Sequence, residues 1–307
     1  MIAFVFPGQG AQAVGMGRAL ADNFDICAKT FAEADAALGE SLSDLIFNGP
    51  MDRLTLTENT QPAILTMSVA VCRLLDQKGI APAFVAGHSL GEYSAHVAAG
   101  TLEFADAVRL VRNRGRYMQE AVPVGVGAMA AIIGLDEAGV NQACEEAAQG
   151  EVVSAANLNG AGQIVIAGAA AAVARASERA KALGAKRAIP LTVSAPFHCA
   201  LMKPAAVRLT PELRSVPTKD PRVPVVANVD ALPKRTASES IDALIKQIAS
   251  PVRWEDVVQR LASEGVTRYV EVGPGKALSG MIKRIASGAT IQNVEGPGDL
   301  AAIEAES

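Results

Sequence analysis

The sequence predicts an α/β protein with a mostly parallel sheet, interrupted by a smaller inserted domain. Short apolar runs at 2–6 and 84–86 alternate with helical patterns, which is typical of a parallel sheet covered by helices. Between them and the C-terminal third, the expected order changes to β-α-β-β-α-β, the ferredoxin-like pattern. We therefore expect a large domain over 1–125 and 195–307, and a small inserted domain over 126–194.

The elements of the large domain are read from apolar patterns and from the glycines that end them. The strand at 2–6 stops at Pro7, and a helical pattern stops at Gly79. Further apolar runs predict strands at 223–227 and 268–272. The helices are expected at 60–78, 90–99, 104–121, 238–248 and 255–263. The polar and acidic tail at 296–307 is expected to be loose.

The inserted domain shows four short strand patterns and two helical ones. Asn159, Gly160 and Gly162 mark the turn between its second and third strands. The strands are expected at 128–133, 152–156, 163–167 and 186–191, and the helices at 136–148 and 169–183.

Composition excludes several classes of function. The net charge of −4 and the pI near 5.5 argue against a general nucleic-acid binder, which carries a basic excess. The four cysteines form no CxxC pair, so neither a metal site nor a disulfide framework is expected. No signal peptide and no apolar run of membrane-spanning length is visible. We expect a cytoplasmic, monomeric protein that needs no metal or cofactor.

The residues at 87–91, GHSLG, match the pattern G-x-S-x-G between a predicted strand and a predicted helix. In this context the glycines allow a sharp turn that exposes the serine hydroxyl, so Ser89 is the expected nucleophile. The N-terminus of the following helix supplies free N–H groups, and the N–H of Leu90 is the expected donor to an oxyanion. A glycine-rich turn with an inert serine is the alternative.

A serine nucleophile needs a general base, and the chain has three histidines. His88 adjoins Ser89, and neighbours at a tight turn rarely aim at one point. His96 lies roughly 10 Å along the following helix, where a structural role is favoured. His198 follows the return from the inserted domain, in the kind of loop that carries catalytic groups, and is the expected base. The alternatives are His96 or no histidine base at all.

No acidic third member stands out, because nothing singles out one of Asp220, Asp230 and Asp242. A backbone or amide carbonyl can orient the imidazole instead. Cys199, next to His198, is interpreted as a buried structural cysteine.

Three other patterns are weaker evidence of a functional site. The glycine-rich turn at 8–13 fits G-x-G-x-x-A, but no acidic residue follows at a strand end, so a turn that brings Gln9 to the nucleophile is favoured over a nucleotide site. The run GPGK at 273–276 lacks the remaining residues of a phosphate loop. Four arginines share one helix, and composition does not choose between them. For Arg109, Arg112 and Arg116 a solvated face is expected.

Ordered motifs over nearly the whole chain resemble the malonyl-CoA:acyl-carrier-protein transacylase family of fatty acid synthesis. Acyltransferase domains of polyketide synthases share the pattern. The motifs are FPGQGAQ at 6–12, ENTQPA at 58–63, GHSLGEYSA at 87–95, RGRYMQEA at 114–121, SAPFH at 194–198, QIASPVRW at 247–254 and EVGPGKAL at 271–278. The resemblance implies an α/β-hydrolase-like large domain with a ferredoxin-like insert.

The resemblance also implies a set of roles. Ser89 matches the nucleophile, His198 the base, and Arg114 the arginine that binds the malonyl carboxylate. Gln9, with the Leu90 amide, matches the oxyanion donors.

Three further positions match residues around the site. Gln247 matches the residue whose backbone carbonyl orients the histidine, which would explain the missing acid. Asn157 corresponds to a polar residue that lines the site. Phe197 resembles the malonyl-selective form, in which a bulky ring crowds an α-methyl branch.

The implied partners are malonyl-CoA and an acyl carrier protein, and neither nucleic acid nor a membrane is expected. The implied reaction is a two-step transfer through a malonyl-serine. Because the carrier is acidic, a basic docking surface is expected among Arg175, Arg179, Lys181, Lys186, Arg187, Lys283 and Arg284. The competing hypotheses are a serine hydrolase, a trans-acting polyketide acyltransferase and a non-catalytic α/β protein.

Overall fold

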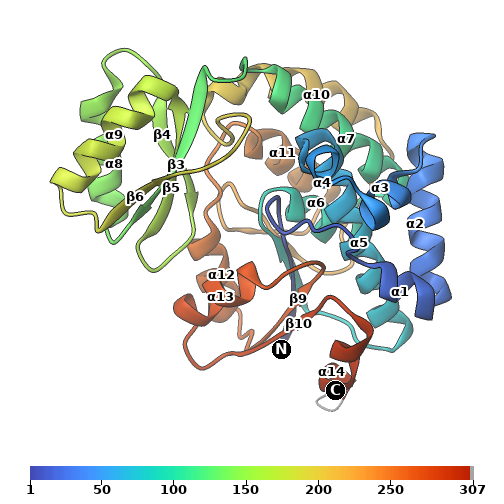
Figure 1. Ribbon diagram of the computed structural model, residues 1–307. Helices are drawn as coiled ribbons and strands as arrows, with labels where there is room; N and C mark the ends of the chain where they lie inside the picture. The colour runs from blue at the N-terminus through green and yellow to red at the C-terminus, as the bar shows by residue number, and fades with distance from the viewer. Residues whose placement is uncertain (305–307) are drawn as a thin grey trace.

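The computed structural model describes residues 1–304 and contains a six-stranded and a four-stranded sheet (Figure 1). The large sheet has the strand order β10-β9-β1-β2-β7-β8, and all its pairs are parallel except β7 with β8. This confirms the predicted α/β class. Within residues 1–304, no helix combines the length and the apolar character needed to cross a membrane.

The large sheet is built around β1, which is buried on both faces. Because alternate residues of a strand point to opposite sides, β1 contributes side chains to two cores. Phe4 and Phe6 pack into one core, and Ala3 and Val5 into a second. The strands are β1 (Ile2–Phe6), β2 (Phe84–Gly87), β7 (Val225–Val226), β8 (Pro233–Lys234), β9 (Arg268–Val272) and β10 (Thr290–Val294). Since β1, β2 and β9 run parallel, their carboxyl ends meet at one edge, where ligands gather in open sheets.

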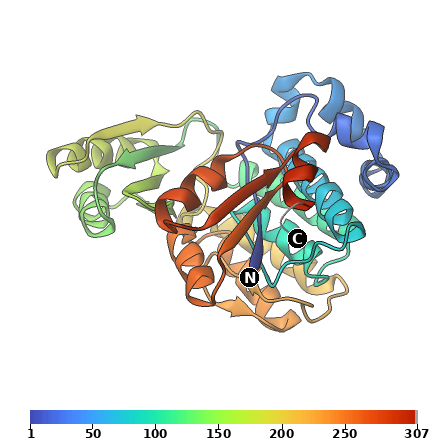
Figure 2. The same cartoon turned by 90° about the horizontal axis from the view of Figure 1, so that it is seen from below.

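Helices cover both faces of this sheet (Figures 1 and 2). The larger core is formed with α2, α5 and α7, and the smaller with α12 and α13. The bounds are α1 (Arg18–Asn23), α2 (Asp25–Leu38), α3 (Leu42–Asn48), α4 (Met51–Thr55), α5 (Thr57–Gln77), α6 (Leu90–Ala98), α7 (Phe104–Glu120), η1 (Ala200–Met202), α10 (Lys203–Ser215), α11 (Ala237–Gln247), α12 (Trp254–Ser263), α13 (Ala277–Ile285), η2 (Pro297–Asp299) and α14 (Leu300–Glu304).

The four-stranded sheet is antiparallel, with the order β4-β5-β3-β6. Its elements are β3 (Gly127–Ile133), α8 (Glu137–Ala148), β4 (Val153–Leu158), β5 (Gln163–Ala169), α9 (Ala170–Ala182) and β6 (Arg187–Pro190). The two helices share a core with one face of the sheet, as the ferredoxin-like pattern predicts. This unit lies to one side of the large sheet (Figure 2). We propose that it is a separate domain over 126–194.

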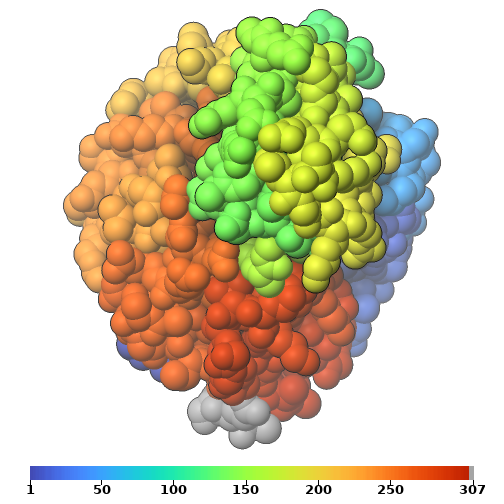
Figure 3. All heavy atoms as spheres, turned by 90° about the vertical axis from the view of Figure 1, so that its left-hand side faces the viewer, coloured from blue at the N-terminus to red at the C-terminus, as the bar shows by residue number. Residues whose placement is uncertain are grey.

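Backbone hydrogen bonds join the small unit to the large one. Val252, just before α12, pairs with β4: its N–H donates to Ala156 O at 2.8 Å, and its carbonyl accepts from Leu158 N at 2.8 Å. In Figure 3 the small unit, green to yellow, lies above the red C-terminal segments and beside the orange ones. The two units are therefore in direct contact along β4.

The prediction of a loose tail was wrong for the described part of it. Residues 297–304 form η2 and α14, and Leu300 and Ile303 are buried. The Arg268 guanidinium donates to Ile303 O at 3.0 Å. Two apolar residues three apart are enough to hold a short helix against the sheet. Residues 305–307 lie outside the described part of the chain.

Candidate active site

Ser89 lies at the sharp turn between β2 and α6. Its φ of 53° and ψ of −107° are unusual for a residue with a side chain. The turn needs glycine on both sides: a Cβ on Gly87 would lie 2.0 Å from Gly91 C, and a Cβ on Gly91 would lie 2.0 Å from Phe6 O. This close packing leaves the Ser89 hydroxyl at the carboxyl edge of the sheet.

The amide side chain of Asn228, in the loop after β7, holds this turn. The Ser89 N–H donates to Asn228 Oδ1 at 2.7 Å, and Asn228 Nδ2 donates to Gly87 O at 2.7 Å. Both ends of the strained turn are therefore bound to one side chain, which offsets part of the strain.

His198 lies beside Ser89, in the loop between β6 and η1. Its Nε2 is 2.6 Å from Ser89 Oγ, and its Nδ1 is 3.1 Å from the carbonyl oxygen of Gln247. Because a carbonyl only accepts, Nδ1 carries the hydrogen and Nε2 is free to accept the proton of the serine. The arrangement is a serine, a histidine and a backbone carbonyl in series, and it needs no carboxylate.

The electrostatics keep this histidine neutral in the resting site. Burial, first, and the nearby Arg114 cation, second, lower the pKa of His198 to about 3. The imidazole is therefore ready to accept a proton over the whole physiological range.

Arg114 projects from α7 into the site and is almost fully buried. Its Nη1 donates to Gln61 Oε1 at 2.8 Å, and its Nη2 donates to Gln247 Oε1 at 2.9 Å and to Ser89 Oγ at 3.2 Å. Within residues 1–304 no carboxylate contacts the guanidinium. Burial lowers the pKa of Arg114, because it disfavours the charged form. A buried cation with neutral partners, next to a nucleophile, suits a ligand carboxylate.

The other expected residues surround the same pocket, which has a volume of about 230 Å³. Gln9, Leu90, Asn157 and Phe197 all line it. The Gln9 side-chain amide donates to Thr57 Oγ1 at 3.2 Å, and the Leu90 N–H opens α6, where no helical acceptor exists. The pocket thus brings together the loop after β1, the sharp turn around Ser89, β4 and the loop before η1.

Comparisons with known proteins agree with this geometry. A family model described as an acyl transferase domain matches residues 3–297. The malonyl CoA-acyl carrier protein transacylase of Escherichia coli (strain K12) is 55% identical over 301 residues, which are 98% of this chain and 97% of the relative. The chain belongs to this family of acyl transferases.

Solved structures are also similar over nearly the whole chain. An acyl carrier protein S-malonyltransferase from Vibrio cholerae is 49% identical with a TM-score of 0.97, and covers 98% of this chain and 99% of its own. A malonyl-transacylase in complex with a type II PKS acyl-carrier protein is 48% identical with a TM-score of 0.97, over 100% and 99% of the two chains. The two-part fold of this acyl transferase is therefore that of its relatives.

Within residues 1–304, neither of the other two histidines of this acyl transferase forms a hydrogen bond with the Ser89 hydroxyl. His88 Nε2 is 2.9 Å from Asn159 Oδ1, and its ring packs on Trp254 at 5.7 Å between centroids. His96 is fully buried, and burial lowers its pKa to about 3. Cys199 is buried too: its thiol donates to Pro196 O, and burial raises its pKa to about 11.

The three aspartates considered as a third member all bind elsewhere. Asp220 accepts from Ala237 N, Asp230 pairs with Lys234, and Asp242 pairs with Arg214. The acceptor on His198 Nδ1 is instead a main-chain carbonyl, to which side-chain patterns give no clue.

One prediction about the arginine helix was wrong. Arg112 was expected on a solvated face, but it is buried, where it donates to Asn59 and forms an ion pair with Glu40. Arg109 and Arg116 are exposed, as expected. Position 112 turns inward because helix α2 and the loop after it cover that part of α7.

Sequence reasoning missed three polar residues of the network. Gln61 accepts a hydrogen bond from Arg114, and Asn228 holds the sharp turn around Ser89. Glu92 accepts from both Asn228 and Gln247. Gln61 and Glu92 lie inside the quoted motifs ENTQPA and GHSLGEYSA, but their burial is visible only in the structure.

Proposed function

We propose that this chain transfers a malonyl group from malonyl-CoA to the phosphopantetheine thiol of an acyl carrier protein, and so supplies fatty acid synthesis. The observation that carries the proposal is the buried Arg114, whose Nη2 donates to the hydroxyl of Ser89. A carboxylate bound by this guanidinium is held within reach of the nucleophile. The names of the relatives from Escherichia coli and Vibrio cholerae support the same reaction.

In the first half-reaction Ser89 Oγ attacks the carbonyl carbon of the malonyl thioester. His198 Nε2 takes the hydroxyl proton, and the imidazolium is stabilised by the Gln247 carbonyl at Nδ1. The N–H of Leu90 and the amide of Gln9 donate to the developing oxyanion. The carbon–sulfur bond then breaks, and the CoA thiolate takes the proton from Nε2.

In the second half-reaction the carrier thiol replaces CoA. Its sulfur attacks the malonyl ester while His198 Nε2 takes the thiol proton. The bond to Ser89 Oγ breaks, and the serine recovers its proton from the imidazole. Arg114 holds the malonyl carboxylate throughout, so the ester carbonyl stays oriented toward the incoming thiol.

Selection among acyl groups follows from the same contacts. An acetyl group leaves the buried charge of Arg114 without a carboxylate, which costs binding free energy. The ring of Phe197 lines the pocket next to His198 and narrows the space for an α-methyl branch. The proposed substrate is therefore malonyl, in preference to acetyl and methylmalonyl groups.

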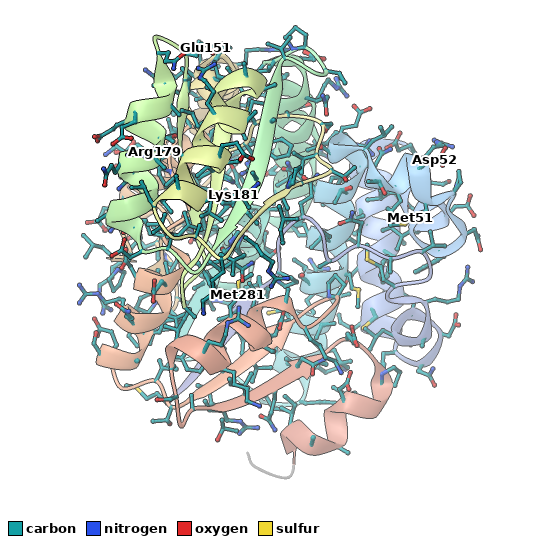
Figure 4. The ribbon with its side chains drawn as sticks, turned by 60° about the vertical axis from the view of Figure 1, so that its left-hand side comes forward. Met51, Asp52, Glu151, Arg179, Lys181 and Met281 are labelled. Atoms are coloured by element: carbon teal, nitrogen blue, oxygen red, sulfur yellow. The ribbon has the colours of Figure 1, made fainter. Side chains whose placement is uncertain are left out.

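The complex formed by a similar malonyl-transacylase supports an acyl carrier protein as partner. Of the basic residues proposed for docking, Arg179 and Lys181, labelled in Figure 4, pair with Glu146 and Glu178, and Arg175 pairs with Glu151. The exposed Lys186, Arg187 and Lys283 are better placed to meet an acidic carrier. A monomeric state and a cytoplasmic location are part of the proposal.

The decisive test is the intact mass of the protein after incubation with malonyl-CoA or acetyl-CoA. The wild type should gain a malonyl adduct and little acetyl adduct, and a carrier protein should discharge it. The variant Ser89→Ala should gain none. Release of free malonate at the same rate without a carrier would favour a serine hydrolase instead.

A further inference from the structure

Glu92 is a fully buried carboxylate on the first turn of α6, three residues after Ser89. Within residues 1–304, only one of its oxygens has hydrogen-bond partners. Oε2 accepts from Asn228 N at 3.0 Å and from Gln247 Nε2 at 2.9 Å. Oε1 has no hydrogen-bond partner in the described part of the chain and lies 4.0 Å from His96 Nε2.

The two donors to Oε2 each control a different part of the site. Asn228 holds Ser89 N and Gly87 O, and therefore the strained turn. Gln247 presents its backbone carbonyl to His198 and its Oε1 to Arg114.

The orientation of the Gln247 amide depends on Glu92. With Oε2 accepting from Nε2, the amide oxygen faces the guanidinium, where it accepts from Nη2 of Arg114 at 2.9 Å. Without that acceptor, only the Ser89 carbonyl at 2.9 Å and the more distant Asn228 Oδ1 at 3.5 Å, within residues 1–304, oppose a flip that would turn an N–H toward the cation.

We propose that Glu92 is a positioning residue for acyl transfer: its Oε2 atom fixes Asn228 and Gln247, and through them the nucleophile, the base and the carboxylate-binding arginine. The proposal rests on the proposed function. Burying a carboxylate is costly, and a fold that needed only shape at this position would be served by an apolar side chain. Burial raises the pKa of Glu92 to about 7, while its bonds from Gln247 and Asn228 favour the carboxylate.

Three substitutions distinguish the role of Glu92 as a hydrogen-bond acceptor from the role of its negative charge. In Glu92→Gln the amide oxygen can take the place of Oε2 and accept from Asn228 and Gln247, and the new N–H₂ group points toward His96 Nε2. Both hydrogen bonds to this oxygen then survive without the charge. Glu92→Asp keeps the charge but withdraws the oxygen by one methylene. Glu92→Leu removes both. Ser94→Ala is the matched control, because the Ser94 hydroxyl is buried on the same helix without a hydrogen-bond partner.

The experiment measures kcat and KM for malonyl transfer, the ratio of malonyl to acetyl loading on Ser89, and the thermal unfolding midpoint. We expect Glu92→Gln to stay within about 3-fold of wild type in kcat. Glu92→Leu should lose about 100-fold in kcat and Glu92→Asp about 10-fold, both with a reduced malonyl preference, since displacements near 1 Å have effects of this size. Ser94→Ala should match the wild type.

Two results would overturn the proposal. If folded Glu92→Asp keeps the wild-type kcat and malonyl preference while Glu92→Gln loses them, charge matters and positioning does not. If all three variants melt earlier but keep kcat and the malonyl preference, the role is only structural. Glu92→Asp and Glu92→Gln decide the question even where Glu92→Leu does not fold. A wild type that gains no malonyl adduct would instead refute the proposed function.

Discussion

At the scale of single residues, the proposed base and the proposed carboxylate-binding arginine are electrostatically linked. The Arg114 cation is the second cause, after burial, of the low pKa of His198. A malonyl carboxylate paired with the guanidinium offsets that cation, so the pKa of His198 rises when the substrate is bound. The substrate thereby increases the basicity of the group that activates Ser89.

Replacing Arg114 tests its role as the carboxylate partner. Arg114→Ala should lower kcat/KM for malonyl-CoA by about 10- to 100-fold, the range expected when a charged hydrogen bond is lost. Acetyl-CoA should be affected less. Arg116→Ala, on the same helix but half exposed, is the control and should change neither. Steady-state rates with both thioesters provide the measurement, and equal losses with both would contradict carboxylate selection.

Histidines 96 and 198 make the protein sensitive to acid. The folded pKa of each is about 3, below the ordinary value of 6.5, so between these values the unfolded chain binds more protons than the folded one. Stability is then lost as pH falls from about 6.5 toward 3. Glu92 acts in the opposite sense, because its raised pKa of about 7 favours the folded state at lower pH.

The variant His96→Leu isolates one of these contributions. Its free energy of unfolding should fall less steeply than that of the wild type as pH is lowered from 6.5 to 4, by at most about 1.4 kcal/mol per pH unit. Urea titrations at several pH values measure the two slopes. Parallel slopes would mean that His96 does not titrate in this way.

At the scale of elements, the turn from β2 to α6 depends on backbone packed against backbone. A Cβ on Gly91 would meet the main-chain oxygen of Phe6, which cannot move without disturbing β1. We expect Gly91→Ala to cost about 3 kcal/mol of stability. Gly280→Ala, on the outer side of α13, would meet no atom closer than 3.9 Å and should be neutral or gain up to about 1 kcal/mol. Chemical unfolding of both variants gives the comparison.

The elements with a clear hydrophobic period could be predicted from the sequence, and the others could not. β1, β2, β9 and the four strands of the small sheet were found, with ends shifted by a few residues. The short helices α1, α3 and α4 were missed because five to seven residues give no stable period. α10 was missed because Pro211 interrupts its pattern, and β8 is too short to recognise.

The residues of the site could be predicted where a known sequence motif contains them. Ser89 follows from G-x-S-x-G, and His198 from elimination among few histidines. Gln247 came only from the resemblance, because its contact with His198 uses a main-chain oxygen. Asn228 and Glu92 act through tertiary contacts between distant loops and α6, which no local pattern encodes.

At the scale of the whole molecule, the C-terminal helix closes the edge of the large sheet. Ile303 is fully buried. We expect Ile303→Ala to lower the free energy of unfolding by about 2 to 4 kcal/mol, as for other buried aliphatic residues. Ala301→Ser, at an exposed position on the same helix, is the control. If both variants unfold together with the wild type, the helix contributes nothing to stability.

The pairing of Val252 with β4 has a consequence for turnover. One wall of the pocket, Asn157, belongs to the strand that is hydrogen-bonded to the segment following Gln247. Separating the two units would break this pairing and move the residue that orients the base. We therefore expect coenzyme A to depart, and the carrier arm to arrive, while the two units stay paired along β4. On this expectation, the exchange of the two acyl carriers at Ser89 needs no separation of the two units.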